Sequence, residues 1–147
     1  MPEPLLSRRY FIASGVLVGA GTLLGALPLR PDRCNGHRVD HGPHPTPRPG
    51  IDASHVLTDE QLKGASKDAI TAFDQVRQIP QIVDGIRCHC GCAVDKKSFY
   101  SLLSCYEPDG MARECHICQG QGRMAFRLHG EGKSLNDIRE AIDAKYD

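Results

Sequence analysis

One stretch combines two cysteines with a helical segment: CHICQGQGRMAFRL, residues 115–128. It predicts a helix that Gly130 and Gly132 end, although two internal glycines weaken its first turns. If Cys115 opens this helix, its sulfur lies near unpaired amide donors and the positive end of the helix dipole, which favours the thiolate. The C-x-x-C spacing of Cys115 and Cys118 is used both by zinc knuckles and by catalytic dithiols.

Three further segments predict helices around this one. A capping box at Thr58 begins a helical pattern that Pro80 ends, and a second helix is expected over 96–106. A fourth begins at the N-cap Ser134, with Asp137 three residues further on. No stretch alternates long enough to predict a sheet. The sequence therefore predicts an all-α domain, a small cysteine-rich helical domain over 57–147, with about four helices and a C-x-C-x-C loop.

The cysteines are concentrated in the same domain: the chain has seven, and six lie between positions 88 and 118. Alternate residues of an extended chain point the same way, so the sulfurs of C-x-C-x-C can converge on one centre. Neighbouring C-x-C thiols bond to each other only with strain, which favours metal ligation over a simple staple. The candidate metal ligands are Cys88, Cys90, Cys92, Cys105, Cys115 and Cys118, with His89 and His116 as further candidates.

Thiolate chemistry leaves three interpretations. We favour a soft-metal-binding protein for capture, storage or delivery, with copper(I) ahead of zinc, because a polynuclear Cu(I) site uses more sulfurs than a structural zinc site. The first alternative is an enzyme, an extracytoplasmic thiol–disulfide oxidoreductase with Cys115 and Cys118 as the working pair. The second is a disulfide-stapled domain used for docking, a common solution for small exported domains.

The N-terminal part of the chain predicts export. The sequence SRRYFI at residues 7–12 is the pattern of a twin-arginine signal, and the uncharged run 11–29 can span a bilayer if it is not cleaved. We expect residues 1–29 to be a signal or membrane anchor and the protein to be periplasmic or otherwise extracytoplasmic. Residues 30–56 are rich in Pro, Gly and His and predict a disordered linker, which leaves Cys34 and the linker histidines outside the site.

Composition excludes other classes of function. The chain has 18 Lys+Arg and 18 Asp+Glu, and a net charge of zero argues against a nucleic-acid-binding protein. No Ser/His/Asp arrangement, phosphate-binding glycine loop or paired-carboxylate signature supports a hydrolase or a kinase. The expected partners are a metal ion and an envelope metal or redox protein.

Several of these residues also resemble a known family. The motif RCHCGC at 87–92, Cys105-Tyr106, the C-x-x-C pair and the ending GKSLNDIR at 132–139 are similar to the bacterial PCYCGC-motif family, also called the CYCXC (seleno)protein family. The resemblance covers about the last sixty residues. It implies an exported or lipid-anchored envelope protein, and its selenocysteine-containing members imply that one position of the cluster is reactive or a soft ligand. This chain has Arg87 and His89 where the family motif has Pro and Tyr.

Overall fold

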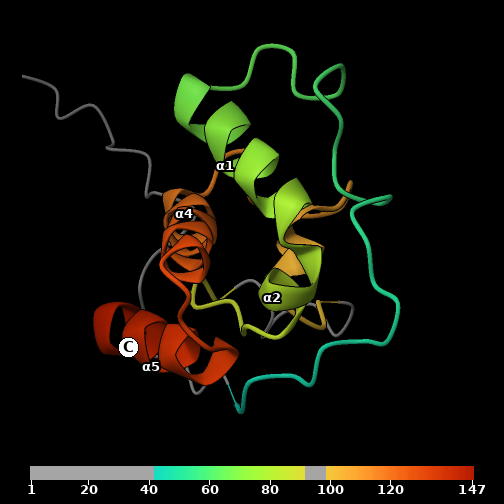
Figure 1. The fold of residues 1–147 in the computed structure, drawn as a ribbon. Coiled ribbons are helices and arrows are strands. Elements are labelled where there is room, and N and C mark those ends of the chain that lie inside the picture. The colour runs from blue at the N-terminus through green and yellow to red at the C-terminus, as the bar shows by residue number, and fades with distance from the viewer. Residues whose placement is uncertain (1–41, 92–98) are drawn as a thin grey trace, which may run out of the picture. The chain divides into compact units, whose positions relative to one another are not determined.

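The computed structural model describes residues 42–91 and 99–147. Within these ranges the elements are α1 (Lys67–Gln78), α2 (Pro80–Asp84), the short 3-10 helix η1 (Leu103–Tyr106), α4 (His116–Gly130) and α5 (Leu135–Tyr146). This part of the chain contains four α-helices and no strand, which confirms the all-α fold class (Figure 1). The signal or anchor expected over 1–29 lies outside the described residues.

The two C-terminal helices begin where the sequence places them, and a side-chain cap explains the start of α5. The Ser134 hydroxyl accepts a hydrogen bond from the Asp137 amide, and the Asp137 carboxylate accepts one from the Ser134 amide, so the capping box that opens α5 is complete. Cys115 is the N-cap of α4 in extended conformation, and α4 continues through both internal glycines to Gly130. Both starts agree with the sequence.

The first helix begins later than the sequence predicts. Thr58 and Gln61 do form the expected hydrogen bond, but it closes only a turn. Gly64 follows in the left-handed region at φ +82°, which ends any helical run there. Ser66 then caps a new start by accepting a hydrogen bond from the Ala69 amide. The helix therefore starts at Lys67.

The first helix ends at Gln78, just before Pro80, as the sequence predicts, whereas the 96–106 segment differs from expectation. Pro80 itself opens α2 at its first position, where its missing N–H is not needed. Of the second expected helix, residues 96–98 lie outside the described ranges, and within 99–106 only the four residues of η1 are helical. The amide of Leu102 donates to the Ile86 carbonyl at 2.7 Å, so it is not available for an α-helical bond to residue 98.

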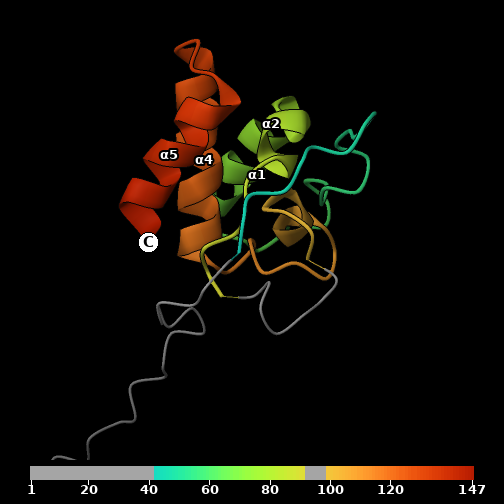
Figure 2. The same cartoon turned by 90° about the horizontal axis from the view of Figure 1, so that it is seen from below.

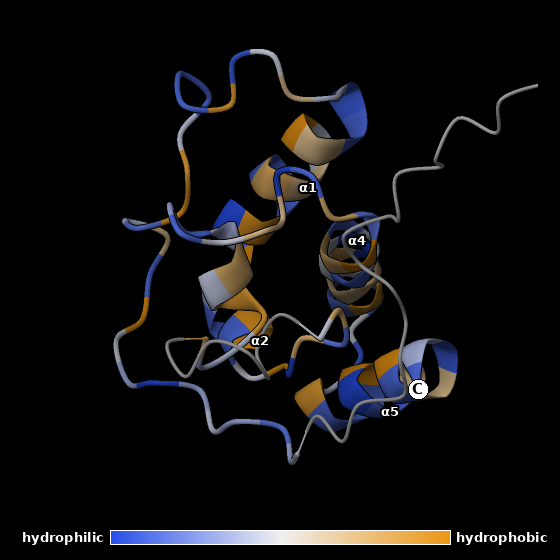
Figure 3. Ribbon diagram, turned by 180° about the vertical axis from the view of Figure 1, so that it is seen from behind, coloured by the Kyte–Doolittle hydropathy of each residue, from blue (hydrophilic) through white to orange (hydrophobic). Residues whose placement is uncertain are grey.

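The helices pack around a shared apolar core. Helix α4 contacts α1, α2 and α5, and Figure 2 shows α4 and α5 side by side. Hydrophobic and hydrophilic residues are mixed along these helices in Figure 3, as expected for helices that bury one face. Phe73 of α1 meets Tyr106 of η1 edge-on, with ring centroids 4.7 Å apart. No helix in the described ranges is long and apolar enough to cross a membrane.

Two glycines allow close approaches that other residues would block. A Cβ at Gly122 would lie 2.2 Å from the Tyr106 hydroxyl oxygen and 2.9 Å from a Val76 methyl, so α4 contacts both α1 and η1 through a bare backbone. A Cβ at Gly110 would lie 2.0 Å from the Cys105 carbonyl oxygen. These positions keep η1 and the turn after it against α4.

Part of the expected linker is packed on the helical domain. We call residues 42–48 the strap; it runs from beside α5 to α2 (Figure 1). The Arg48 amide and guanidinium donate to the buried Asp84 carboxylate, to which the Ser101 hydroxyl also donates. Arg139 of α5 donates to the Pro45 carbonyl at 2.8 Å. Hydrogen bonds to charged groups, rather than the burial of apolar side chains, thus hold the strap on the domain. This explains why its composition predicts a disordered linker.

The strap contact at Asp84 predicts a large stability effect. The Asp84 side chain is 0% exposed, so Arg48→Ala removes the positive charge that pairs with a buried carboxylate and should lower the free energy of unfolding by about 3 kcal/mol. Chemical denaturation measures this. Arg127→Ala, which breaks an exposed pair with Glu131, is the matched control and should change stability by less than about 1 kcal/mol. Equal effects of the two substitutions would contradict the role of the strap.

The close approach at Gly122 gives a second prediction. Gly122→Ala forces Tyr106 and Val76 aside and should cost about 1–3 kcal/mol. Gly130→Ala places a Cβ in open space at the end of the same helix and should stabilise by up to about 1 kcal/mol. Thermal unfolding of the two variants should therefore shift in opposite directions, and a shift in the same direction would be evidence against the packing described here.

Candidate metal centre

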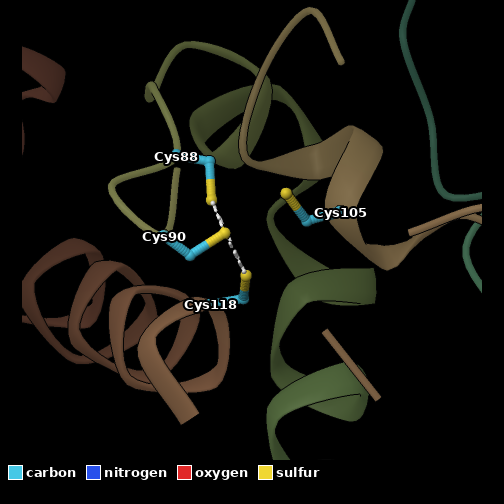
Figure 4. A group of neighbouring side chains, drawn as sticks. All are labelled: Cys88, Cys90, Cys105 and Cys118. Carbon is cyan, nitrogen blue, oxygen red and sulfur yellow. Dashed lines mark hydrogen bonds between the residues drawn. The ribbon is translucent and has the colours of Figure 1, made fainter. Parts of the chain in front are cut away.

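Four cysteine sulfurs from three segments meet in the core. Cys88 and Cys90 lie on the loop after α2, Cys105 lies on η1, and Cys118 lies in the first turn of α4 (Figure 4). Their Sγ atoms all lie within 4.8 Å of one another. Each of the four residues is buried, with Cys90 the most exposed at 7%. A buried group of four thiols can hold a metal ion.

Hydrogen bonds to backbone carbonyls hold these segments together. The Tyr106 hydroxyl donates to the Cys118 carbonyl at 2.8 Å and so joins η1 to α4. The Ile86 carbonyl accepts the Leu102 amide, which joins the Cys88 loop to the chain that enters η1. After Cys90 the chain turns at Gly91, whose φ of +77° favours glycine.

The sulfur separations fit ligands of a metal ion better than bonded cysteines. Cys88 Sγ lies 3.1 Å from Cys90 Sγ and 3.6 Å from Cys118 Sγ, and the Cys90–Cys118 separation is 3.4 Å. A disulfide requires about 2.05 Å. Four thiolates at about 2.3 Å from a tetrahedral ion lie about 3.8 Å apart, which is nearer than a disulfide bond length to the three separations given. None of the described cysteines is part of a disulfide.

Hydrogen bonds between the thiols lower the pKa values of some of these cysteines and raise those of others. Hydrogen bonds from Cys105, then from Cys115 and Cys118, lower the pKa of Cys90 to about 3. The pKa of Cys88 is also well below its ordinary value, chiefly because of Cys105. The pKa of Cys118 is raised, first by its hydrogen bond with Cys105. Negative charge therefore gathers on the Cys88–Cys90 loop, where a cation would neutralise it.

The remaining predicted ligands are placed differently. Cys115 is 1% exposed and lies within hydrogen-bonding reach of Cys90 and Cys118, so it is a fifth sulfur at the edge of the group. Cys92 lies outside the described residues, as does Cys34. His116 is exposed on α4. His89 turns from the sulfurs toward α5, where its Nε2 lies 3.0 Å from Asp143 Oδ1.

His89 belongs to a charged group that sequence reasoning missed. Its imidazole, Arg87 and the strap residue His44 surround the carboxylates of Asp143 on α5 and of Asp147 directly after this helix. Burial lowers the pKa values of both histidines, so both are neutral near pH 7. His44 and Asp143 are 99 residues apart in the chain, and no local pattern could have paired them.

The geometry bears on the other two interpretations. A thiol–disulfide oxidoreductase needs a thiol that a substrate can reach, whereas Cys115 and Cys118 are 1% and 0% exposed. A disulfide staple needs bonded sulfurs, and no pair of cysteines in the described part of the chain lies at that distance. Metal binding is the chemistry that the observed arrangement suits best.

Comparisons with known proteins add no assignment. No protein-family model, no curated protein and no solved structure matches this chain. The chemistry of the site must therefore be argued from its own residues.

The shared hydrogen bonds predict the titration of the metal-free site. Part of the thiolate ultraviolet absorbance of the reduced protein should persist at about pH 6, below the ordinary cysteine value of about 8.5. Because the folded-state pKa of Cys90 is depressed, its contribution to stability is complete above the unfolded pKa and is lost as pH falls toward about 3.

A variant tests the cause of this shift. Cys105→Ala removes the largest hydrogen bond to Cys90 and should move the residual thiolate signal to higher pH. Cys34→Ala is the control and should leave the residual thiolate signal at about pH 6 unchanged. If the thiols of the wild-type protein all titrate together near 8.5, the hydrogen bonds between them do not lower the pKa of Cys90.

Proposed function

We propose that this chain is an exported soft-metal-binding protein that captures, stores or delivers Cu(I), with zinc as the second choice of ion. Its ligands would be Cys88, Cys90, Cys105 and Cys118, with Cys115 and Cys92 as additional sulfurs. One observation carries the proposal: four buried sulfurs from three separate segments lie within 4.8 Å of one another.

Burial of the sulfurs supports binding over turnover. Thiolate charge that is removed from water is costly unless a cation accompanies it. The lowered pKa values of Cys88 and Cys90 place such charge in the core. A soft cation bound there would replace several thiol protons and would stabilise the fold, since the unfolded chain has no preformed site.

The number of sulfurs favours Cu(I) and their arrangement also accommodates zinc. A single zinc ion needs four thiolates at the corners of a tetrahedron, which the four grouped cysteines can supply. Cys115, in reach of Cys90 and Cys118, is then unused. A cluster of two or more Cu(I) ions uses bridging thiolates and would employ this fifth sulfur.

Location outside the cytoplasm is part of the proposal. It rests on the twin-arginine-like residues 7–12 and on the resemblance to the PCYCGC-motif family. Export of an already folded domain would allow the metal to be bound before the thiols meet an oxidising compartment. An envelope metal or redox protein is the partner expected to exchange the ion.

Metal titration of the reduced full-length protein under anaerobic conditions tests the proposal. Competition with a Cu(I) chelator should reveal more than one tightly bound Cu(I), while zinc should bind with one equivalent. Cys118→Ala should weaken both ions at least about tenfold, and Cys115→Ala should reduce Cu(I) capacity while leaving zinc affinity nearly unchanged. Cys34→Ala is the control and should bind as wild type does. A folded, reduced protein that binds neither ion would refute the proposal.

A further inference from the structure

The four grouped cysteines are called the sulfur cluster below. The charged group around His89 beside it has the geometry of a second metal site. His89 Nε2 lies 3.0 Å from Asp143 Oδ1 and 3.2 Å from Asp147 Oδ1. Ligands at about 2.1 Å from a first-row metal ion lie about 3.0 Å apart in an octahedral arrangement and about 3.4 Å apart in a tetrahedral one. The two separations from the nitrogen are therefore those expected for ligands of one ion, and all three atoms lie within 4.8 Å of one another.

Proton placement at His89 is inconsistent with a simple hydrogen-bond network. Arg87 Nε, which can only donate, lies 3.2 Å from His89 Nε2, whereas both carboxylate oxygens can only accept. If Nε2 carries a proton, this N–H faces the N–H of Arg87. If Nε2 carries a lone pair, this lone pair faces those of the two carboxylate oxygens. A metal ion in the place of that proton satisfies the nitrogen and both oxygens.

His44 is suited to orient Asp143 rather than to bind the ion. Its Nδ1 accepts the Arg87 backbone amide at 3.1 Å, so in the neutral ring the proton must be on Nε2. That Nε2–H donates to the Asp143 carboxylate at 3.0 Å. A fixed donor behind a ligating carboxylate is the usual second layer of a metal site.

Arg87 is the competing cation. Its Nη2 lies 3.2 Å from Asp143 Oδ1 and 2.5 Å from Asp147 Oδ2, and it neutralises both carboxylates. The guanidinium also donates through Nη1 to the Gly42 carbonyl at 2.7 Å, and 18% of the side chain is exposed. It can therefore turn toward the strap and solvent when another cation binds.

We propose that His89, Asp143 and Asp147 form a second site, distinct from the sulfur cluster, for a divalent transition-metal ion that prefers nitrogen and oxygen ligands. Arg87 occupies the site when the ion is absent, and His44 is a positioning residue. Because His89 lies between Cys88 and Cys90, the two sites share one loop but use different chemistry.

Binding of Mn²⁺ to the reduced full-length protein tests the second site, since carboxylates suit Mn²⁺ and thiolates suit softer ions. Electron paramagnetic resonance of free Mn²⁺ gives the affinity. Arg87→Gln removes the competing charge and should tighten binding at least about fivefold. Asp147→Asn, at a half-exposed position, should weaken it at least about tenfold, and His44→Gln about tenfold.

The control is Glu140→Gln, an exposed acidic residue on the same helix, which should leave Mn²⁺ affinity unchanged. If these residues form only an ion-pair network, neither the wild-type protein nor Arg87→Gln should bind Mn²⁺. The inference is overturned if wild type and Arg87→Gln both fail to bind Mn²⁺, or if Asp147→Asn behaves as the control does. The sulfur cluster is measured by Cu(I) competition, so either site can fail without the other.

Discussion

The hydrogen bond from the Tyr106 hydroxyl to the Cys118 carbonyl is the contact on which the sulfur cluster depends. Tyr106 is fully buried and directly follows Cys105, so fixing its ring also fixes that sulfur. Gly122 makes the approach possible, because any side chain there would collide with the hydroxyl. Core packing and the placement of the sulfurs thus depend on the same contact. The Tyr106 ring sets the distance between η1 and α4, the helix that carries Cys118.

A second set of contacts surrounds this core and is almost entirely polar. Asp84 has no exposed side-chain surface and accepts from Arg48 and Ser101. Burial alone would raise the pKa of Asp84, but these hydrogen bonds hold it below the ordinary value. The strap therefore stabilises the domain by supplying partners to charges that the helices bury, while the aromatic and aliphatic residues form the interior.

The sequence predicts those features that depend on neighbouring residues. The Ser134 capping box, the start of α4 at Cys115 and the grouping of cysteines are local or compositional, and the structure has each of them. The start of α1 was misplaced because Ser66 competes as a cap after Gly64 turns the chain. Long-range pairs such as Leu102 with Ile86 shorten η1, and the orientation of His89 toward α5 depends on packing that no spacing rule encodes.

The attachment of the strap to α5 has a consequence for the order of assembly. His44 and Asp143 are separated by 99 residues, and Pro45 and Arg139 by 94. Contacts of such long range form late, because chain entropy must be lost before they contribute. During synthesis His44 and Pro45 have no partner on α5 until the last helix has emerged from the ribosome, whereas the partner of Arg48, Asp84 of α2, emerges earlier. The cysteines of the proposed metal site lie between these partners in the chain, so an ion would meet them before the strap closes onto α5.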